Sequence, residues 1–394
     1  MRFLVLLVVI AATATPTRAL TAATPADTIR VSLVTFYPGS DIYELFGHSE
    51  IRVTDPRYGD VYFNYGVFDF AAPNFLYRFI TGETDYWCLP VPPRFAAEPG
   101  EPRRMVEQEL NLTQEQARRL SDMLTVNAQP GNNTYRYKYF SDNCATRPRD
   151  MIERAVGCEM RYDGSDDAQL RRPLTFRRVM RHYTAHYPWE QFGIDLLLGS
   201  ACDTAITWRQ AMFVPLILRH AAARSVIATD SASRPLVRRE LTLVDGDEQG
   251  TILPPTPWYL SPMAAALLLL AFAACVTLIE RKRRRRARLS RWLDCLLWLT
   301  LGLMGGIIAF LLLFSSHEAV APNFNILWLH PLYLVMAIMV WFKRTQRALR
   351  AISVANLVLI AAMAVVWLSG LQVPHPAFVP LAATAALRAA ARLF

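Results

Sequence analysis

The chain has 394 residues, 53% of them hydrophobic, and a formal net charge of +9 at pH 7. Most of the excess charge lies in short basic runs between apolar segments, so it does not indicate a nucleic-acid-binding protein. Residues 20–256 have the composition of a soluble domain, whereas the chain is mostly apolar from Trp258 onward. The sequence therefore predicts two domains, one at 20–256 and a membrane domain at 257–394.

The N-terminus, MRFLVLLVVIAATATPTRAL, begins with an arginine and a short apolar run, and small residues follow up to Ala19. This pattern is typical of a secretory signal peptide, and the apolar run is shorter than a usual membrane-spanning helix. We therefore expect residues 1–19 to be a signal peptide and residues 20–256 to be exported. An uncleaved membrane anchor is the alternative.

Three strands are predicted early in the exported domain. VSLVTF alternates as a strand, PGSD is a turn, and HSEIRV begins a second strand. VYFNYGVF forms a third strand after the turn DPRYGD. Because side chains alternate along a strand, His48, Glu50 and Arg52 share one face of the second strand. A lone histidine at a strand start is usually a packing residue. We therefore consider His48 as a catalytic base only if the domain also contains a nucleophilic side chain.

A cysteine near a helix start is that nucleophile candidate. TYRYKYF is predicted as a strand, SDN as a turn and cap, and a helix as beginning at Ala145, with Pro148 tolerated in its first turn. Cys144 then lies at the helix N-terminus, where free N–H groups and the helix dipole stabilise a thiolate. Arg147 adds positive charge, and the same N–H groups could bind an oxyanion. Upstream, Thr113 opens another helix with a capping box.

The cysteines allow two interpretations. Four cysteines in an exported domain could form two disulfides, which would make Cys144 structural. Alternatively Cys144 is free, with two of the other three paired; the number of cysteines favours neither. The exported cysteines are Cys88, Cys144, Cys158 and Cys202. No cysteine or histidine spacing indicates a metal site, and we expect none.

Four segments are long and apolar enough to cross a bilayer at about 17 to 25 residues each. The third is the shortest, and its internal Pro331 requires compensation within the helix. The segments are YLSPMAAALLLLAFAACVTLI, WLDCLLWLTLGLMGGIIAFLLLF, ILWLHPLYLVMAIMVWF and AISVANLVLIAAMAVVWLSGL.

Basic loops predict the orientation of these spans. RKRRRRARLSR lies between the first and second spans, KRTQRALR lies between the third and fourth, and such loops stay cytoplasmic. The exported domain therefore lies on the outer face. In the last stretch, Arg388 and Arg392 share a helical face, which fits either an interfacial amphipathic helix or a fifth span. The apolar stretches within residues 176–248 fit either the core of the exported domain or a surface that rests on the bilayer.

Five separated stretches resemble the Lnb-type proteins, exported domains followed by a small membrane bundle. They occur in the family's order and extend over nearly the whole chain: LVTFYPGSDIYELFGHSEIRV, VYFNYGVFDF, YFSDNCATRPRDMI, FGIDLLLGSACDTAITWRQAMFVPLIL and APNFNILWLHPL. A histidine on a strand followed by an "NC" pair also resembles circularly permuted papain-like enzymes such as the lecithin–retinol acyltransferases. The resemblance implies an α+β, permuted papain-like exported domain, followed by an all-α bundle of four or five helices.

The Lnb resemblance implies an apolipoprotein N-acyltransferase in the bacterial inner membrane, with its catalytic domain in the periplasm. A membrane phospholipid would be the acyl donor, diacylglyceryl-modified apolipoproteins the acceptors, and no cofactor is expected. Cys144 would carry the acyl chain as a thioester, and His48 would transfer protons.

The residue that orients the imidazole is predicted less directly. Papain-like sites use a polar partner for this task, and Asn64 on the neighbouring strand is our choice. Glu50 is an alternative, as is Asp60 if the strand register differs. Asn143 and Arg147, which flank the cysteine closely, are further candidates for orienting or oxyanion-binding residues.

Two other functions compete with acyl transfer. The first is a papain-like cell-wall peptidase or amidase that uses the spans only as an anchor. The second is a non-enzymatic membrane scaffold in which Cys144 is part of a disulfide. A single helix would be enough for an anchor, whereas four spans with Asn323, Asn325 and His330 near the outer face favour lipid handling.

Overall fold

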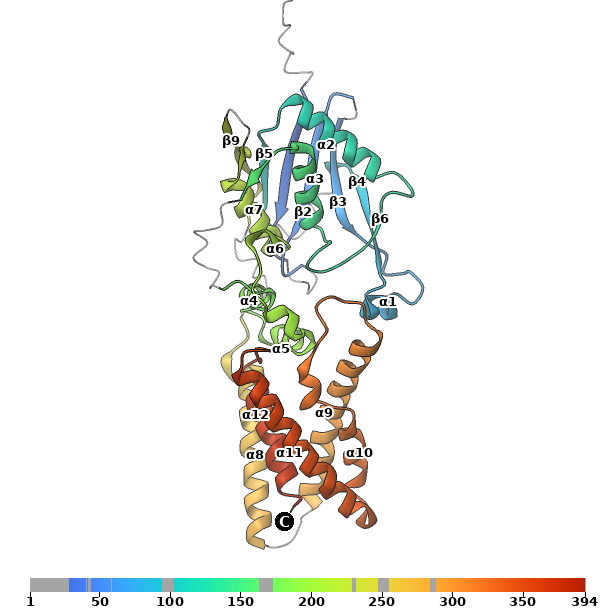
Figure 1. Cartoon of the computed structure of the whole chain (residues 1–394), viewed down its shortest axis with the longest axis vertical. Coiled ribbons are helices and arrows are strands. Elements are labelled where there is room, and N and C mark those ends of the chain that lie inside the picture. Colours follow the sequence, from blue (N-terminus) through green and yellow to red (C-terminus); the bar gives the residue numbers. More distant parts are fainter. Residues whose placement is uncertain are drawn as a thin grey trace, which may run out of the picture.

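The computed structural model describes residues 28–39, 41, 44–57, 59–93, 103–162, 173–228, 232–246, 255–283 and 288–393. The predicted signal peptide lies outside these residues. Figure 1 shows a domain built around a β-sheet at one end of the molecule and a bundle of helices at the other.

The main sheet has seven strands in the order β10-β5-β1-β2-β3-β4-β6, and all neighbouring strands are antiparallel. The three strands predicted early in the domain are present as β1, β2 and β3. Of the predicted strand TYRYKYF only the first residues form a strand, β6. The strands are β1 Arg30–Phe36, β2 His48–Asp55, β3 Gly59–Val67, β4 Asp85–Val91, β5 Met105–Leu110, β6 Thr134–Arg136 and β10 Val237–Val244. A second sheet pairs β7 Met160–Arg161, β8 Val226–Ala228 and β9 Ser233–Pro235.

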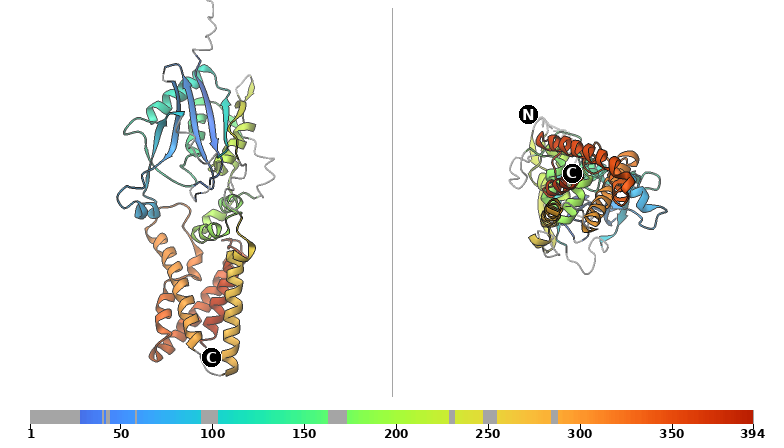
Figure 2. Two further views of the ribbon diagram at one scale, coloured as in Figure 1. Left: turned by 180° about the vertical axis from the view of Figure 1, so that it is seen from behind. Right: turned by 90° about the horizontal axis from the view of Figure 1, so that it is seen from below.

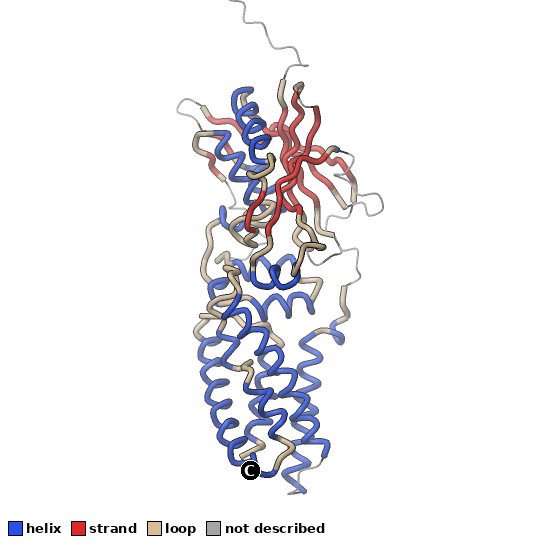
Figure 3. The backbone as a smooth tube through the Cα atoms, turned by 90° about the vertical axis from the view of Figure 1, so that its right-hand side faces the viewer, coloured by secondary structure: helices blue, strands red, loops and turns tan. Residues whose placement is uncertain are grey.

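Helices cover one face of the main sheet, as the side view in Figure 3 shows. They are α2 Gln114–Asn127, α3 Thr146–Val156 and α7 Pro215–Arg224. The predicted capping box is present, because the Thr113 side chain accepts from the Gln116 N–H and the Gln116 side chain reaches back. Leu33 and Ile51 of the sheet belong to the same buried cluster as Leu120 of α2. The opposite face, seen from behind in Figure 2, carries no helix in the described part of the chain.

Three helices of the second region are long and apolar enough to cross a membrane: Pro262–Arg283 (α8), Arg288–Phe314 (α9) and Lys343–Leu368, which comprises η6 Lys343–Thr345 and α11 Gln346–Leu368. The structure differs from the prediction at the third predicted span. That segment is divided into η5 Phe324–Leu327 and the short helix α10 Leu332–Met339. Pro331 has no N–H to continue a helical ladder, and α10 begins directly after it.

The C-terminal stretch forms α12, Phe378–Ala390, which packs against α8 and α11. Its Arg388 is buried and forms ion pairs with Asp294 of α9, at 2.6 Å, and Glu280 of α8, at 3.1 Å. Arg392 also contacts Asp294. The shared helical face of the two arginines therefore points into the bundle, and α12 is shorter than a full span.

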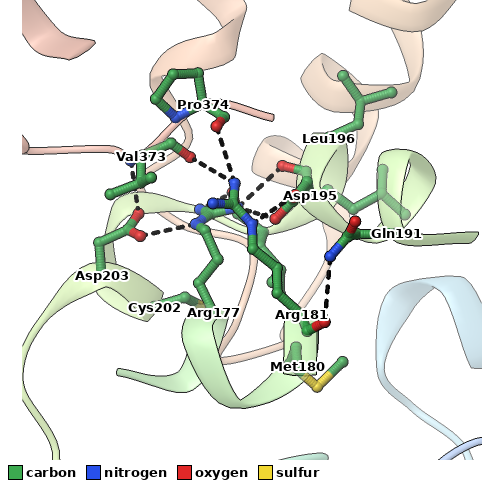
Figure 4. A network of polar contacts seen from close by, with 12 residues as sticks. Arg177, Met180, Arg181, Gln191, Asp195, Leu196, Cys202, Asp203, Val373 and Pro374 are labelled. Carbon is green, nitrogen blue, oxygen red and sulfur yellow. Dashed lines mark hydrogen bonds and ion pairs between the residues drawn. The ribbon is translucent and has the colours of Figure 1, made fainter. Parts of the chain in front are cut away.

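Residues 176–203 join the two regions. They form α4 Phe176–Tyr183, α5 Pro188–Leu197 and η3 Ser200–Asp203. Figure 4 shows Arg177 and Arg181 around Asp195, with Arg181 reaching the carbonyl of Pro374 in the loop before α12. The first apolar stretch of this part of the chain, in α5, thus lies against the bundle. The second follows α6 Trp208–Ala211 and forms α7 in the core of the exported domain.

Candidate active site

His48 and Asn64 are brought together by the register of two strands. Glu50 of β2 pairs with Asn64 of β3, which places Asn64 diagonally opposite His48. His48 Nε2 lies 3.0 Å from Asn64 Oδ1, and that oxygen also accepts a 2.7 Å hydrogen bond from the Gly66 N–H. Because Asn64 presents its oxygen, Nε2 carries the hydrogen and Nδ1 is the nitrogen that can exchange a proton elsewhere.

The loop before α3 is held by the side chain of Asn143. Its Oδ1 accepts from the N–H groups of Ala145 and Thr146, at 2.8 and 2.9 Å. Its Nδ2 donates to the carbonyls of Tyr139 and Phe213. Cys144 follows Asn143 directly and lies just before the helix, within the segment that these hydrogen bonds fix. Both amide hydrogens of Asn143 therefore already have acceptors, and two of the N–H groups at the helix start are used by Asn143 itself.

The Cys144 thiol lies close enough to the His48 imidazole to favour the protonated form of the ring. Burial of the imidazole opposes its protonation, but Cys144 and Glu50 outweigh burial and raise the pKa of His48 to about 10. The imidazolium is therefore retained at neutral pH and lost as the pH rises through about 10. A protonated His48 places a positive charge beside the sulfur, which is the electrostatic requirement for an imidazolium–thiolate pair.

The other candidates for an orienting residue lie differently. A carboxylate oxygen of Glu50 is 3.6 Å from His48 Nε2, beyond an ordinary hydrogen bond but close enough to favour the imidazolium. Asp60 instead binds Arg52 through both oxygens, at 2.9 and 2.6 Å. Arg52 also lowers the pKa of Asp60, chiefly through these hydrogen bonds. Asn64 is thus the residue of the three that contacts the imidazole directly.

Arg147 contacts other residues near the cysteine loop. Its guanidinium forms a bidentate pair with Asp142 at 2.5 and 2.8 Å. It also lies 3.7 Å from the centroid of the Tyr135 ring, in a cation–π contact. These contacts fix the turn that precedes the cysteine.

Four tyrosines lie near enough to the cysteine to interact with it electrostatically, a feature that our sequence analysis did not assign to the site. Burial, followed by the nearby Cys144, raises the pKa of Tyr86 to about 12. The same two causes raise the pKa of Tyr135, Tyr137 and Tyr139 well above the ordinary value. All four phenols therefore stay neutral, so none of them adds a negative charge near the sulfur. The alternation in TYRYKYF was the signal for three of them.

All six cysteines lie among the described residues, and none is in a disulfide. Burial raises the pKa of Cys88 to about 11 and that of Cys202 to about 12, so both stay protonated thiols at neutral pH. The structure thus gives no support to a scaffold with a crosslinked Cys144. Within the described ranges, no group of three or more His, Cys, Asp or Glu side chains is arranged to hold a metal ion.

Comparison with known proteins assigns both regions to one family. The model of the Lnb N-terminal periplasmic domain matches residues 16–182, and that of the Lnb transmembrane domain matches residues 255–394. The chain belongs to the Lnb-type family. It is a membrane protein with a periplasmic domain. No curated protein and no solved structure matches it.

The Lnb transmembrane domain contributes a residue next to the cysteine loop. Glu318, in the loop that follows α9, accepts hydrogen bonds from the N–H groups of Phe140 and Ser141, at 2.8 and 3.0 Å. Its other oxygen accepts from the Ser141 hydroxyl at 2.8 Å. The loop that carries Cys144 is therefore tied to the membrane domain.

Proposed function

We propose that this Lnb-type protein is an apolipoprotein N-acyltransferase of the bacterial inner membrane. It moves an acyl chain from a membrane phospholipid to the α-amino group of the diacylglyceryl-modified N-terminal cysteine of a lipoprotein. The proposal is supported by a cysteine–histidine–asparagine arrangement whose cysteine loop is tied to the membrane domain.

In the first half-reaction, the Cys144 thiolate attacks the carbonyl carbon of the phospholipid ester. The carbon–oxygen bond to the lysophospholipid breaks, and the His48 imidazolium gives its proton to the departing oxygen. The products are a thioester on Cys144, a lysophospholipid and a neutral imidazole. Asn64 holds Nε2, so that Nδ1 stays directed at the reacting atoms.

In the second half-reaction, the α-amine of the lipoprotein attacks the thioester. Neutral His48 takes a proton from the amine as the amide bond forms and the carbon–sulfur bond breaks. This restores the imidazolium and the thiolate. A thioester suits this step because it reacts readily with amines, and the partial burial of Cys144 limits the access of water to it.

The contact between Glu318 and the cysteine loop is the observation that carries the proposal. It fixes the nucleophile to the membrane domain, near the surface from which both lipid substrates would come. A papain-like peptidase acting on cell-wall peptides has the same catalytic groups. For such an enzyme the membrane domain would be only an anchor, and no contact with the cysteine loop would be needed.

Intact-mass analysis of the full chain in phospholipid vesicles tests the proposal. We expect a fatty acyl adduct that is located on Cys144 and released by hydroxylamine. A diacylglyceryl-cysteine peptide with a free amine should then take the acyl group, whereas the same peptide with an acetylated amine should not. A stable unacylated protein in vesicles, or equal discharge by both peptides, would contradict acyl transfer to an amine.

A further inference from the structure

The short helix α1, Phe75–Thr81, projects from the exported domain and lies beside the outer end of α9 (Figure 1). The loop that follows α9 holds its last turn. The Ser315 hydroxyl donates to the carbonyl of Ile80 at 3.0 Å, and the Ser316 N–H donates to that of Thr81 at 2.9 Å. His317 Nε2 lies 2.8 Å from the carbonyl of Phe79. Although α1 belongs to the exported domain, its position is thus set by the membrane domain.

Contacts with α9 place α1 at the depth of the bilayer surface. The Tyr77 ring lies 6.5 Å from that of Phe310, about one turn before the end of the span. Tyrosine and tryptophan side chains gather at this depth in membrane proteins. Trp258 and Tyr259, directly before the first span, are likewise exposed.

The outer surface of α1 and the loop before it is unusually apolar. Leu76 is 69% exposed, Phe70 63%, Tyr77 55% and Phe79 47%. A group of large apolar side chains this exposed indicates an interaction surface. Because the group adjoins the outer end of a membrane span, the lipid of the outer leaflet is what covers it.

Aromatic rings continue from this surface into the exported domain. The Phe79 ring stacks on Phe75 with centroids 5.8 Å apart, and Phe75 stacks on Phe68 at 5.7 Å. Phe70, at the exposed end, also contacts Phe68, at 4.5 Å.

The row then continues towards Cys144. Phe68 lies 4.8 Å from Tyr86, and Tyr86 stacks on Tyr137 at 4.3 Å. Both tyrosines are close enough to Cys144 for its charge to raise their pKa values. A series of aromatic rings in contact therefore leads from the membrane surface to Tyr137, in the segment that precedes the cysteine.

We propose that α1 and residues 68–74 form a lipid-entry element. It lies in the outer leaflet and guides one fatty acyl chain of a membrane phospholipid along the aromatic row to Cys144. The row gives a hydrocarbon chain continuous apolar contact once it leaves the bilayer, which lowers the cost of exposing it to water. This inference rests on the proposed function, because it names the route by which the acyl donor reaches the same thiol.

Photocrosslinking in vesicles tests the placement of α1. The full chain, with p-benzoylphenylalanine in place of Leu76, is reconstituted in phosphatidylethanolamine–phosphatidylglycerol vesicles and irradiated. Val126 is the matched control, because it is 53% exposed and belongs to α2, a helix that Figure 1 shows at the end of the domain away from the bundle. We expect a covalent phospholipid adduct from position 76 and none from position 126. The absence of an adduct at position 76 would overturn the proposal.

Kinetics of acylation test the route. Leu76→Asp puts a charge where lipid is expected, at a side chain that is 69% exposed. Acylation of Cys144 by vesicle phospholipid should slow by at least about tenfold. Acylation by p-nitrophenyl butyrate, a soluble ester with a short chain, should be unchanged, as should both reactions in Val126→Asp. A wild-type rate with vesicles in Leu76→Asp would overturn the route.

The outcomes for the two proposals are distinguishable. If wild-type Cys144 takes an acyl group from neither donor, the proposed function fails, and with it the route to the thiol. The crosslinking result then still decides separately whether α1 lies in lipid. If the wild-type protein is acylated and Leu76→Asp slows both donors equally, the function stands and the lipid-entry role of α1 is overturned.

Discussion

A single added methyl group should separate His48 from Cys144, the two side chains that we propose to act in catalysis. A Cβ atom at Gly66 would lie 2.6 Å from His48 Cε1, whereas ordinary contacts begin at 3.4 Å. Gly66 lies in β3 with no positive φ, so alanine meets no backbone strain there. The imidazole, which is only partly buried, must therefore move by about 1 Å, and a misplacement of that size costs on the order of 100-fold in rate.

We expect Gly66→Ala to slow acylation of Cys144 by about 100-fold, equivalent to about 2.7 kcal/mol in the activation barrier. The assay is the time course of the acyl-enzyme by intact mass in phospholipid vesicles. Alkylation of the thiol by iodoacetamide, followed in parallel, should also slow, because the sulfur loses its positive neighbour. Any loss of stability should stay within about 1–3 kcal/mol, the range for overpacking by one methyl group.

Gly193→Ala is the matched control. A Cβ at Gly193 meets no atom within 4 Å, and the residue lies within α5, where alanine is favoured over glycine by about 1 kcal/mol. This variant should acylate at the wild-type rate. If a folded Gly66→Ala protein also reacts at the wild-type rate, the His48 imidazole is not required at its observed position.

Three further variants address other parts of the site and fold. Cys144→Ser should form no hydroxylamine-sensitive adduct. It should also lower the pKa of His48 from about 10, because burial then opposes protonation of the imidazole and Glu50 is the remaining group that favours it. NMR of labelled histidine measures this pKa. Glu318→Ala should slow acylation by about tenfold and also lower the melting temperature, because the cysteine loop loses hydrogen bonds to a carboxylate that contribute about 1.5–3 kcal/mol each. Asp294→Ala should destabilise the protein in detergent by about 3–5 kcal/mol, because it leaves buried arginine charge without its carboxylate.

Each of these three predictions has an outcome that would contradict it, and the last two also have a control variant. A His48 pKa that stays at about 10 in Cys144→Ser would show that the sulfur does not support the imidazolium. Glu83→Ala, which removes a carboxylate elsewhere in the exported domain, should leave acylation unchanged; equal slowing in both would remove the special role of Glu318. Arg350→Ala, at an exposed position on α11, should leave the melting temperature nearly unchanged, and a similar loss in both variants would contradict the importance of the buried network.

Local patterns determined much of the architecture. Alternation along β1, β2 and β3 is a property of neighbouring residues, as are the capping box at Thr113 and the start of the helix after Cys144. The apolar length of the long spans is likewise visible in the sequence. Cys144 and His48 could be chosen as candidates because a helix start and a strand start are local features. Their separation in space is not local, and no pattern in the chain specifies it.

Contacts between distant segments decided the rest. Asn64 rather than Asp60 reaches His48 because of the register between β2 and β3, and a shift by one residue would turn the other side chains to that face. Glu318 meets Ser141 across 177 residues, which depends on how the two domains pack.

The same holds inside the bundle. The amphipathic face of α12 fits a membrane surface equally well, and the carboxylates of Asp294 and Glu280 on other helices explain why Arg388 points inward. The sequence by itself thus determined which elements form, because propensity and periodicity act between near neighbours. Which polar side chains meet was decided by tertiary packing, since a charge or hydrogen-bonding group is satisfied by whatever partner the fold brings to it.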